Sequence, residues 1–158
     1  MDVLDVVAAA AHASEFGAWA RASSFAYPAA NLSHLLGLLL LVGGIGVVDL
    51  RVLGLFKSLP LAALSRALTP PAIFGLVLML PTGATMFAAD ATTLAGSATF
   101  RWKLALIALA LANAVVFRVR FNRLLDREAP PAQARAHAGL SLVLWLSIAA
   151  LGRMIAYN

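Results

Sequence analysis

The sequence predicts an all-α membrane protein: a four-transmembrane-helix bundle preceded by an N-terminal interfacial amphipathic helix. The 158-residue chain is 62% hydrophobic and only 12% charged, whereas soluble domains are about 45–50% apolar and about 25% charged. A chain this short cannot bury so much apolar surface in a water-soluble core. The third observation is that four long windows contain no Asp, Glu, Lys or Arg: residues 22–48, 67–89, 104–117 and 136–152.

These windows define the four spans, since a helix needs about 20 mostly apolar residues to cross a bilayer. We expect a single transmembrane domain, 1–158, with spans near 29–51, 71–89, 101–121 and 136–157. The second span is expected to begin at Pro71, because proline suits the first helical turn. The third window is short, and Lys103 and Arg118 at its ends are expected to reach the interfaces. Small residues should allow close helix packing: Gly37, Gly43, Gly44 and Gly46 in the first span, and Ala105, Ala108 and Ala112 in the third.

Residues 1–24 form the predicted interfacial helix. They contain Asp2, Asp5 and Glu15, so inserting this segment into lipid would cost considerable free energy. His12, Phe16 and Trp19 would fall on one helical stripe. The two aromatic rings are expected to hold this helix at the membrane surface.

The distribution of basic residues predicts the orientation. Segments 51–70 and 118–135 hold eight Lys and Arg residues, and the opposite side holds four. The positive-inside rule makes the richer side cytoplasmic. We therefore expect a protein of the bacterial inner (cytoplasmic) membrane with both termini in the periplasm.

The composition also excludes some functions. The chain has no cysteine, which rules out disulfides and thiolate chemistry. Its net charge of +5 comes from residues that flank spans, so nucleic acid is not a predicted partner. No hydrolase, zinc-protease or nucleotide-binding motif is present, which favours a role other than catalysis. The partners expected are the lipid bilayer and either other membrane subunits or further copies of this chain.

Polar residues within apolar spans are the candidate functional residues, because they are costly there. His34 lies in the outer half of the first span and could bind haem or a metal through a neutral ring nitrogen; alternatively it hydrogen-bonds a neighbouring helix. Pro81 could kink the second span. A candidate cofactor site combines His34, Arg153 and Tyr157. A candidate copper site combines soft and imidazole ligands: His34, His12, Met86 and Met154.

A structural ion pair is predicted at the other end of the first span. Asp49 and Arg51 are two residues apart and so do not face each other. Asp49 is therefore expected to pair with Arg118 or Arg66. His137 begins the fourth span, far from His34, which argues against a haem held between the two rings.

Several short motifs resemble a family of small bacterial inner-membrane proteins of unknown function. They are His34-Leu35-Leu36-Gly37, Asp49-Leu50-Arg51-Val52-Leu53-Gly54, Pro81-Thr82-Gly83, Phe100-Arg101-Trp102-Lys103, Ser141-Leu142-Val143-Leu144-Trp145 and Gly152-Arg153-Met154-Ile155-Ala156-Tyr157. Similar proteins often have a histidine where this chain has Arg118. The resemblance implies a four-helix membrane fold and no particular activity.

Two hypotheses for the function follow from these residues. In the first, the protein is a binding or redox module with a periplasmic-side site around His34 for a metal such as copper, a haem or a quinone. In the second, it is a structural or accessory membrane subunit, or a small transporter, and its polar residues only organise the bundle.

Overall fold

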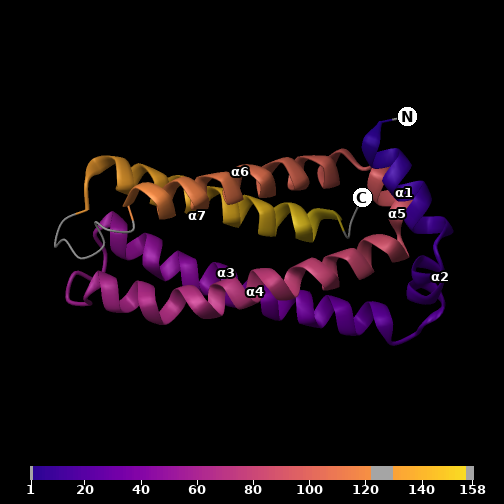
Figure 1. Ribbon diagram of the computed structural model, residues 1–158, viewed down its shortest axis with the longest axis horizontal. Helices are drawn as coiled ribbons and strands as arrows, with labels where there is room; N and C mark the ends of the chain where they lie inside the picture. Colours follow the sequence, from indigo (N-terminus) through magenta and orange to yellow (C-terminus); the bar gives the residue numbers. More distant parts are fainter. Residues whose placement is uncertain (1, 122–129, 156–158) are drawn as a thin grey trace.

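Four long helices form the body of the structure, a computed structural model that describes residues 2–121 and 130–155. They are α3 (Ala26–Leu53), α4 (Leu61–Ala89), α6 (Ala98–Phe121) and α7 (Ala132–Met154). Each is long and apolar enough to cross a bilayer. Figure 1 shows them running along the same long axis. The predicted all-helical class with four spans is confirmed, and the chain is an integral membrane protein.

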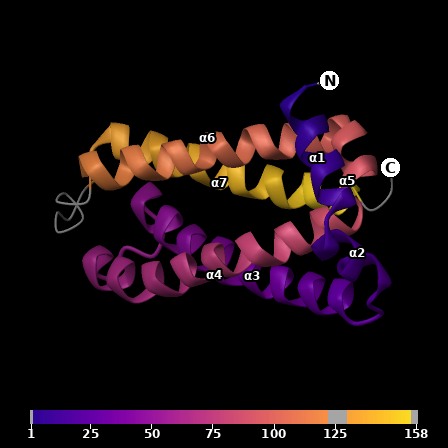
Figure 2. The same cartoon turned by 45° about the vertical axis from the view of Figure 1, so that its right-hand side comes forward.

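Three short helices gather at one end of these four. They are α1 (Val3–Ala13), α2 (Glu15–Ala22) and α5 (Ala91–Gly96). We call this the cap end, and we call the opposite end, where residues 54–60 join α3 to α4, the loop end. Figure 2 shows α1 lying beside α5, with α7 ending close by.

The helix α4 begins at Leu61, well before the predicted start at Pro71. It runs through both Pro70 and Pro71, although an interior proline removes a backbone hydrogen bond and crowds the preceding turn. Tertiary packing explains the difference. Leu61 is 4% exposed and belongs to the loop-end core with Val48 and Val52 of α3. Burying this extra apolar turn offsets the cost of the prolines.

The N-terminal segment is two helices rather than one. Ser14 breaks it with an extended backbone, ψ 153°. Its hydroxyl accepts from the Gly17 amide at 3.0 Å and donates to the Ala11 carbonyl at 2.7 Å. Serine is favoured at such a cap because it satisfies the free amides of a helix start. The break separates His12 from Phe16 and Trp19, so the single stripe predicted for the three residues is wrong. The two aromatic rings stack, 5.6 Å apart, and remain largely exposed.

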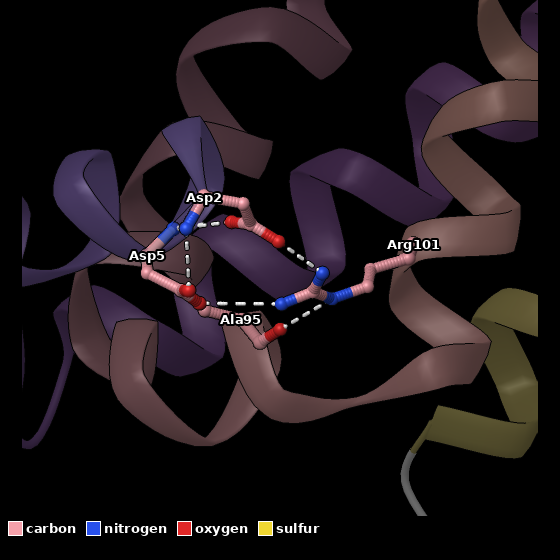
Figure 3. A network of polar contacts seen from close by, with 4 residues as sticks. All are labelled: Asp2, Asp5, Ala95 and Arg101. Carbon is pink, nitrogen blue, oxygen red and sulfur yellow. Dashed lines mark hydrogen bonds and ion pairs between the residues drawn. The ribbon is translucent and has the colours of Figure 1, made fainter.

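An ion-pair network holds α1 against α5 and α6 (Figure 3). The Arg101 guanidinium, from the first turn of α6, pairs with both Asp2 and Asp5 and donates to the Ala95 carbonyl. Asp2 and Asp5 also form a reciprocal capping box at the start of α1. The Asp5 backbone amide and the Arg101 charge both hold the pKa of Asp2 below its ordinary value of 3.8.

Glycine permits direct backbone contact between α3 and α4. A Cβ added at Gly75 would lie 2.5 Å from the Gly37 carbonyl oxygen, and one added at Gly37 would lie 2.7 Å from the Gly75 oxygen. Gly44 packs equally closely on α4, whereas Gly43 faces open space. The predicted close packing is therefore confirmed for Gly37 and Gly44, while a Cβ added at Gly46 would make an ordinary contact, 3.7 Å, with Leu142 of α7.

The predicted small-residue stripe of α6 does not face the bundle. Its three alanines are exposed: Ala105, Ala108 and Ala112. The buried face of α6 instead carries Ala110, 1% exposed, and Asn113, 6% exposed. Alanine is so frequent in this helix that its spacing alone does not identify the packed face.

Candidate functional site

His34 is the polar centre of the cap-end half of the bundle. It is half-buried on α3 and faces α4. Its Nδ1 lies 3.0 Å from the Thr82 hydroxyl, and that hydroxyl donates to the Leu78 carbonyl at 2.8 Å. Gly83 leaves room for the ring, because a Cβ there would lie 3.3 Å from His34 Cε1. The Pro81-Thr82-Gly83 motif therefore forms the α4 side of the histidine site.

The Thr82 contact favours a neutral His34 ring with its proton on Nδ1. A threonine hydroxyl has one proton. Because Thr82 gives that proton to Leu78, its oxygen accepts from Nδ1–H of His34. The backbone of Met79, also an acceptor, interacts with the same ring. The lone pair of the neutral imidazole then remains on Nε2, which can accept a hydrogen bond or bind a ligand.

Lys103 extends from α6 into the same region. Its Nζ lies 3.4 Å from the position that a Cβ would take at Gly152 of α7, so the ammonium lies against the backbone of that helix. It also interacts electrostatically with the His34 ring. Lysine donates up to three hydrogen bonds. The sequence predicts only that Lys103 flanks its span at the interface. The only sequence feature that indicates a contact region shared with His34 is the position of Lys103 within two turns of the helix start.

A surface groove of about 310 Å³ lies next to the histidine. Its volume is at the lower end of the range for small-molecule pockets, about 300–1,000 Å³. The lining is mainly apolar and includes three hydroxyl-bearing residues. It comes from α2, the start of α3 with its N-cap residue, and the last third of α4: Trp19, Phe25, Ala26, Ala29, Ala30, Ser33, Pro81, Thr82 and Thr85. His34 is not among the lining residues, but Thr82 links the two, because it lines the groove and its hydroxyl contacts the ring.

Of the residues predicted to bind copper, His12 does not lie beside His34. His12 lies on exposed α1, where its ring contacts Arg21 at 3.3 Å. Arg21 in turn reaches the Ala88 carbonyl. Thr82, which holds His34, is six residues from Ala88 along α4, or about 9 Å at 1.5 Å per residue. The two histidines therefore occupy different levels.

The two methionines of that prediction differ in their exposure to solvent. Met86 is half-buried on α4, one turn beyond Thr82, and Met154 is 53% exposed at the end of α7. Within residues 2–121 and 130–155, no three His, Asp or Glu side chains cluster as metal ligands.

Arg153 lies in the last turn of α7, at the cap end, with its side chain exposed. A cation is favoured at that position by the helix dipole. The third residue of the predicted cofactor site, Tyr157, lies outside the described residues.

The structure places Asp49 and Arg51 differently from the predicted ion pair. Arg51 donates to the backbone carbonyls of Leu59 at 2.7 Å and Lys57 at 3.3 Å, so it closes the α3–α4 loop. Asp49 is buried, and its Oδ2 has no hydrogen-bond partner among the described residues. Asp49 and Arg118 are both among the described residues, and they form no ion pair with each other.

The comparison with protein families agrees with the motifs above. Residues 10–158 match the profile of a family of unknown function, DUF6644. The chain belongs to this family. The match covers nearly the whole sequence, including all four long helices of this DUF6644 protein. No curated protein and no solved structure matches the sequence.

Proposed function

We propose that this DUF6644 protein is a membrane binding module whose ligand is a quinone or its reduced quinol, held at the cap end by His34 and Lys103. The electrostatic interaction between these two side chains carries the proposal. One comes from α3 and the other from α6, and both lie within otherwise apolar spans. Polar groups at such depth are costly and tend to serve a function.

The chemistry of the pair favours a quinone over a metal ion. His34 Nε2 can accept the hydroxyl proton of a quinol, and the Lys103 ammonium can donate to a quinone carbonyl. The same ammonium would repel a copper ion bound at Nε2, because both carry positive charge. A neutral quinone meets no such repulsion. His12, another candidate copper ligand, also lies at a different level from His34.

The groove beside Thr82 suits the rest of such a ligand. It is mostly apolar and is bordered by Trp19, whose ring could stack on a flat head group. The ligand's isoprenoid tail would lie along the apolar helix surfaces, in contact with lipid. Ser33 and Thr85 add hydroxyl groups that could bind the second ring oxygen. With the predicted orientation, this site opens near the periplasmic surface of the bacterial inner membrane.

The test measures binding of a short-chain ubiquinone to the protein in lipid nanodiscs, by quenching of tryptophan fluorescence. We expect saturable quenching, because Trp19 lines the groove. His34→Ala should abolish the saturable component, since it removes the Nε2 acceptor. Trp19→Phe should remove most of the signal without removing the site.

The matched control is His137→Ala, which removes a half-buried histidine from the other end of the bundle. It should leave quinone binding unchanged. Circular dichroism establishes that each variant keeps its helices. Equal quenching by His34→Ala and wild type would refute the proposal. A haem band in the absorption spectrum, or copper retained in metal analysis, would identify haem or copper as the ligand instead of a quinone. A protein that retains none of the three would favour an accessory role.

A further inference from the structure

The fully buried polar side chains of the described residues gather in the loop-end half, away from His34. They lie on all four long helices: Asp49, Arg51, Ser65, Asn113 and Ser141. Most of them have partners. Asn113 exchanges two hydrogen bonds with His137, at 2.6 Å and 3.1 Å, and Ser65 contacts Thr69 at 3.4 Å. Such contacts join helices within a membrane bundle.

Asp49 is the exception in this group. Asp49 is only 5% exposed. Ser141 of α7 provides a side-chain hydrogen bond to the carboxyl group, yet Oδ2 has no partner among the described residues. A buried polar atom without a partner is destabilising, and more so when it is charged. The structure therefore leaves one carboxyl oxygen in need of a proton or a ligand.

No described cation neutralises this carboxyl group. The helices packed against α3 are chiefly α4 and α7. On α4, Gly44 packs on Leu68, and this contact places Asp49 at the level of Ser65 and Arg66. Arg66 is exposed, so its side chain is directed to the outside of the bundle. On α7, His137 bonds Asn113 and Arg135 donates to the Leu53 carbonyl. Three other described arginines of this half have different surroundings: Arg51 donates to loop carbonyls, and Arg118 and Arg120 are exposed on α6.

We propose that Asp49 is a proton-binding site within the loop-end half of the membrane domain. Oδ2 takes up one proton and the carboxylate becomes a neutral carboxylic acid, while Ser141 hydrogen-bonds the other oxygen. Neutralisation is favourable because an isolated charged carboxylate loses its hydration when it is buried, and no described cation compensates for that loss. The proton would exchange with water at the loop end, about one helical turn away along α3.

A metal cation fits this site less well than a proton. Hard cations take six or more oxygen ligands, and the contacts of Asp49 provide its own carboxyl group and the Ser141 hydroxyl. A proton needs a single acceptor. Membrane carboxyl groups of this kind serve as proton relays in other proteins. The proposal is independent of ligand binding at His34, since the two sites lie in opposite halves of the bundle.

Infrared spectroscopy of the protein in lipid vesicles tests this site. We expect the stretching band of a protonated carboxylic acid at neutral pH in wild type, and its loss in Asp49→Asn. Ser141→Ala should shift the band, because it removes a hydrogen bond to the same group. Asp90→Asn is the matched control: Asp90 is exposed at the end of α4, and this variant should keep the band unchanged.

Two results would overturn the proposal. One is a band that survives in Asp49→Asn. The other is the absence of any protonated-acid band in wild type at neutral pH, which would mean that Asp49 is ionised and hydrated. If Asp49→Asn does not fold, the Ser141→Ala spectrum decides: a shifted band supports protonated Asp49, and an unshifted or absent band contradicts it.

Discussion

Replacing Gly75 by alanine should destabilise the bundle, because α3 and α4 touch through their backbones at this point. The new Cβ would lie 2.5 Å from the Gly37 carbonyl oxygen, 2.9 Å from Leu40 Cβ and 3.0 Å from the Leu41 amide nitrogen. Ordinary contacts between carbon atoms are about 3.5–4.0 Å. Two of the three atoms belong to helix backbone, so the helices must separate rather than a side chain rotate.

The expected magnitude follows from two opposing effects. Overpacking costs about 1–3 kcal/mol, and the rigid neighbours favour a value near the upper limit. Alanine gains roughly 1 kcal/mol over glycine in a helix. The free energy of unfolding should therefore fall by about 2 kcal/mol, which is roughly a 30-fold change in the unfolding equilibrium.

The assay is reversible unfolding by sodium dodecyl sulfate in mixed micelles, followed by circular dichroism. The matched control is Gly43→Ala in α3, where an added Cβ meets nothing within 4 Å. This variant should be as stable as wild type or slightly more stable. If Gly75→Ala and Gly43→Ala unfold at the same detergent fraction, the direct contact between α3 and α4 is wrong.

Two further predictions concern the ends of the bundle. The chain has no cysteine, so Thr93→Cys at the cap end and Ser58→Cys at the loop end, both exposed in the structure, report orientation cleanly. An impermeant maleimide should label only Thr93→Cys in intact cells, and the opposite pattern would reverse the proposed orientation. The lowered pKa of Asp2 means that its contribution to docking α1 is complete above the ordinary value of 3.8 and is lost as the pH falls below it through the folded-state pKa. The protection of α1 amides from hydrogen exchange, relative to their intrinsic exchange rates, should fall over that acid range in wild type. Asp2→Asn should remove this pH dependence of the protection.

The sequence determined the membrane character and the number of spans. Long charge-free windows require a lipid environment, because so short a chain cannot bury them otherwise. The same apolar uniformity conceals which face of each helix packs. Gly43 and Gly44 are adjacent in sequence, but only Gly44 contacts α4. In lipid both the packed and the exposed faces are apolar, so hydrophobic periodicity carries little information about contacts.

Tertiary structure decided the polar interactions. From the sequence, His34 was a candidate ligand, but only the helix arrangement brings Thr82 to its Nδ1 and Lys103 to its neighbourhood. Charge alone predicted an arginine partner for Asp49. The structure instead places Arg51 on loop carbonyls and leaves Asp49 Oδ2 without a partner among the described residues. The physical reason is that a side chain's partner depends on the rotation and depth of each helix. Packing between helices sets both, and neither is encoded in the local hydropathy that identifies a span.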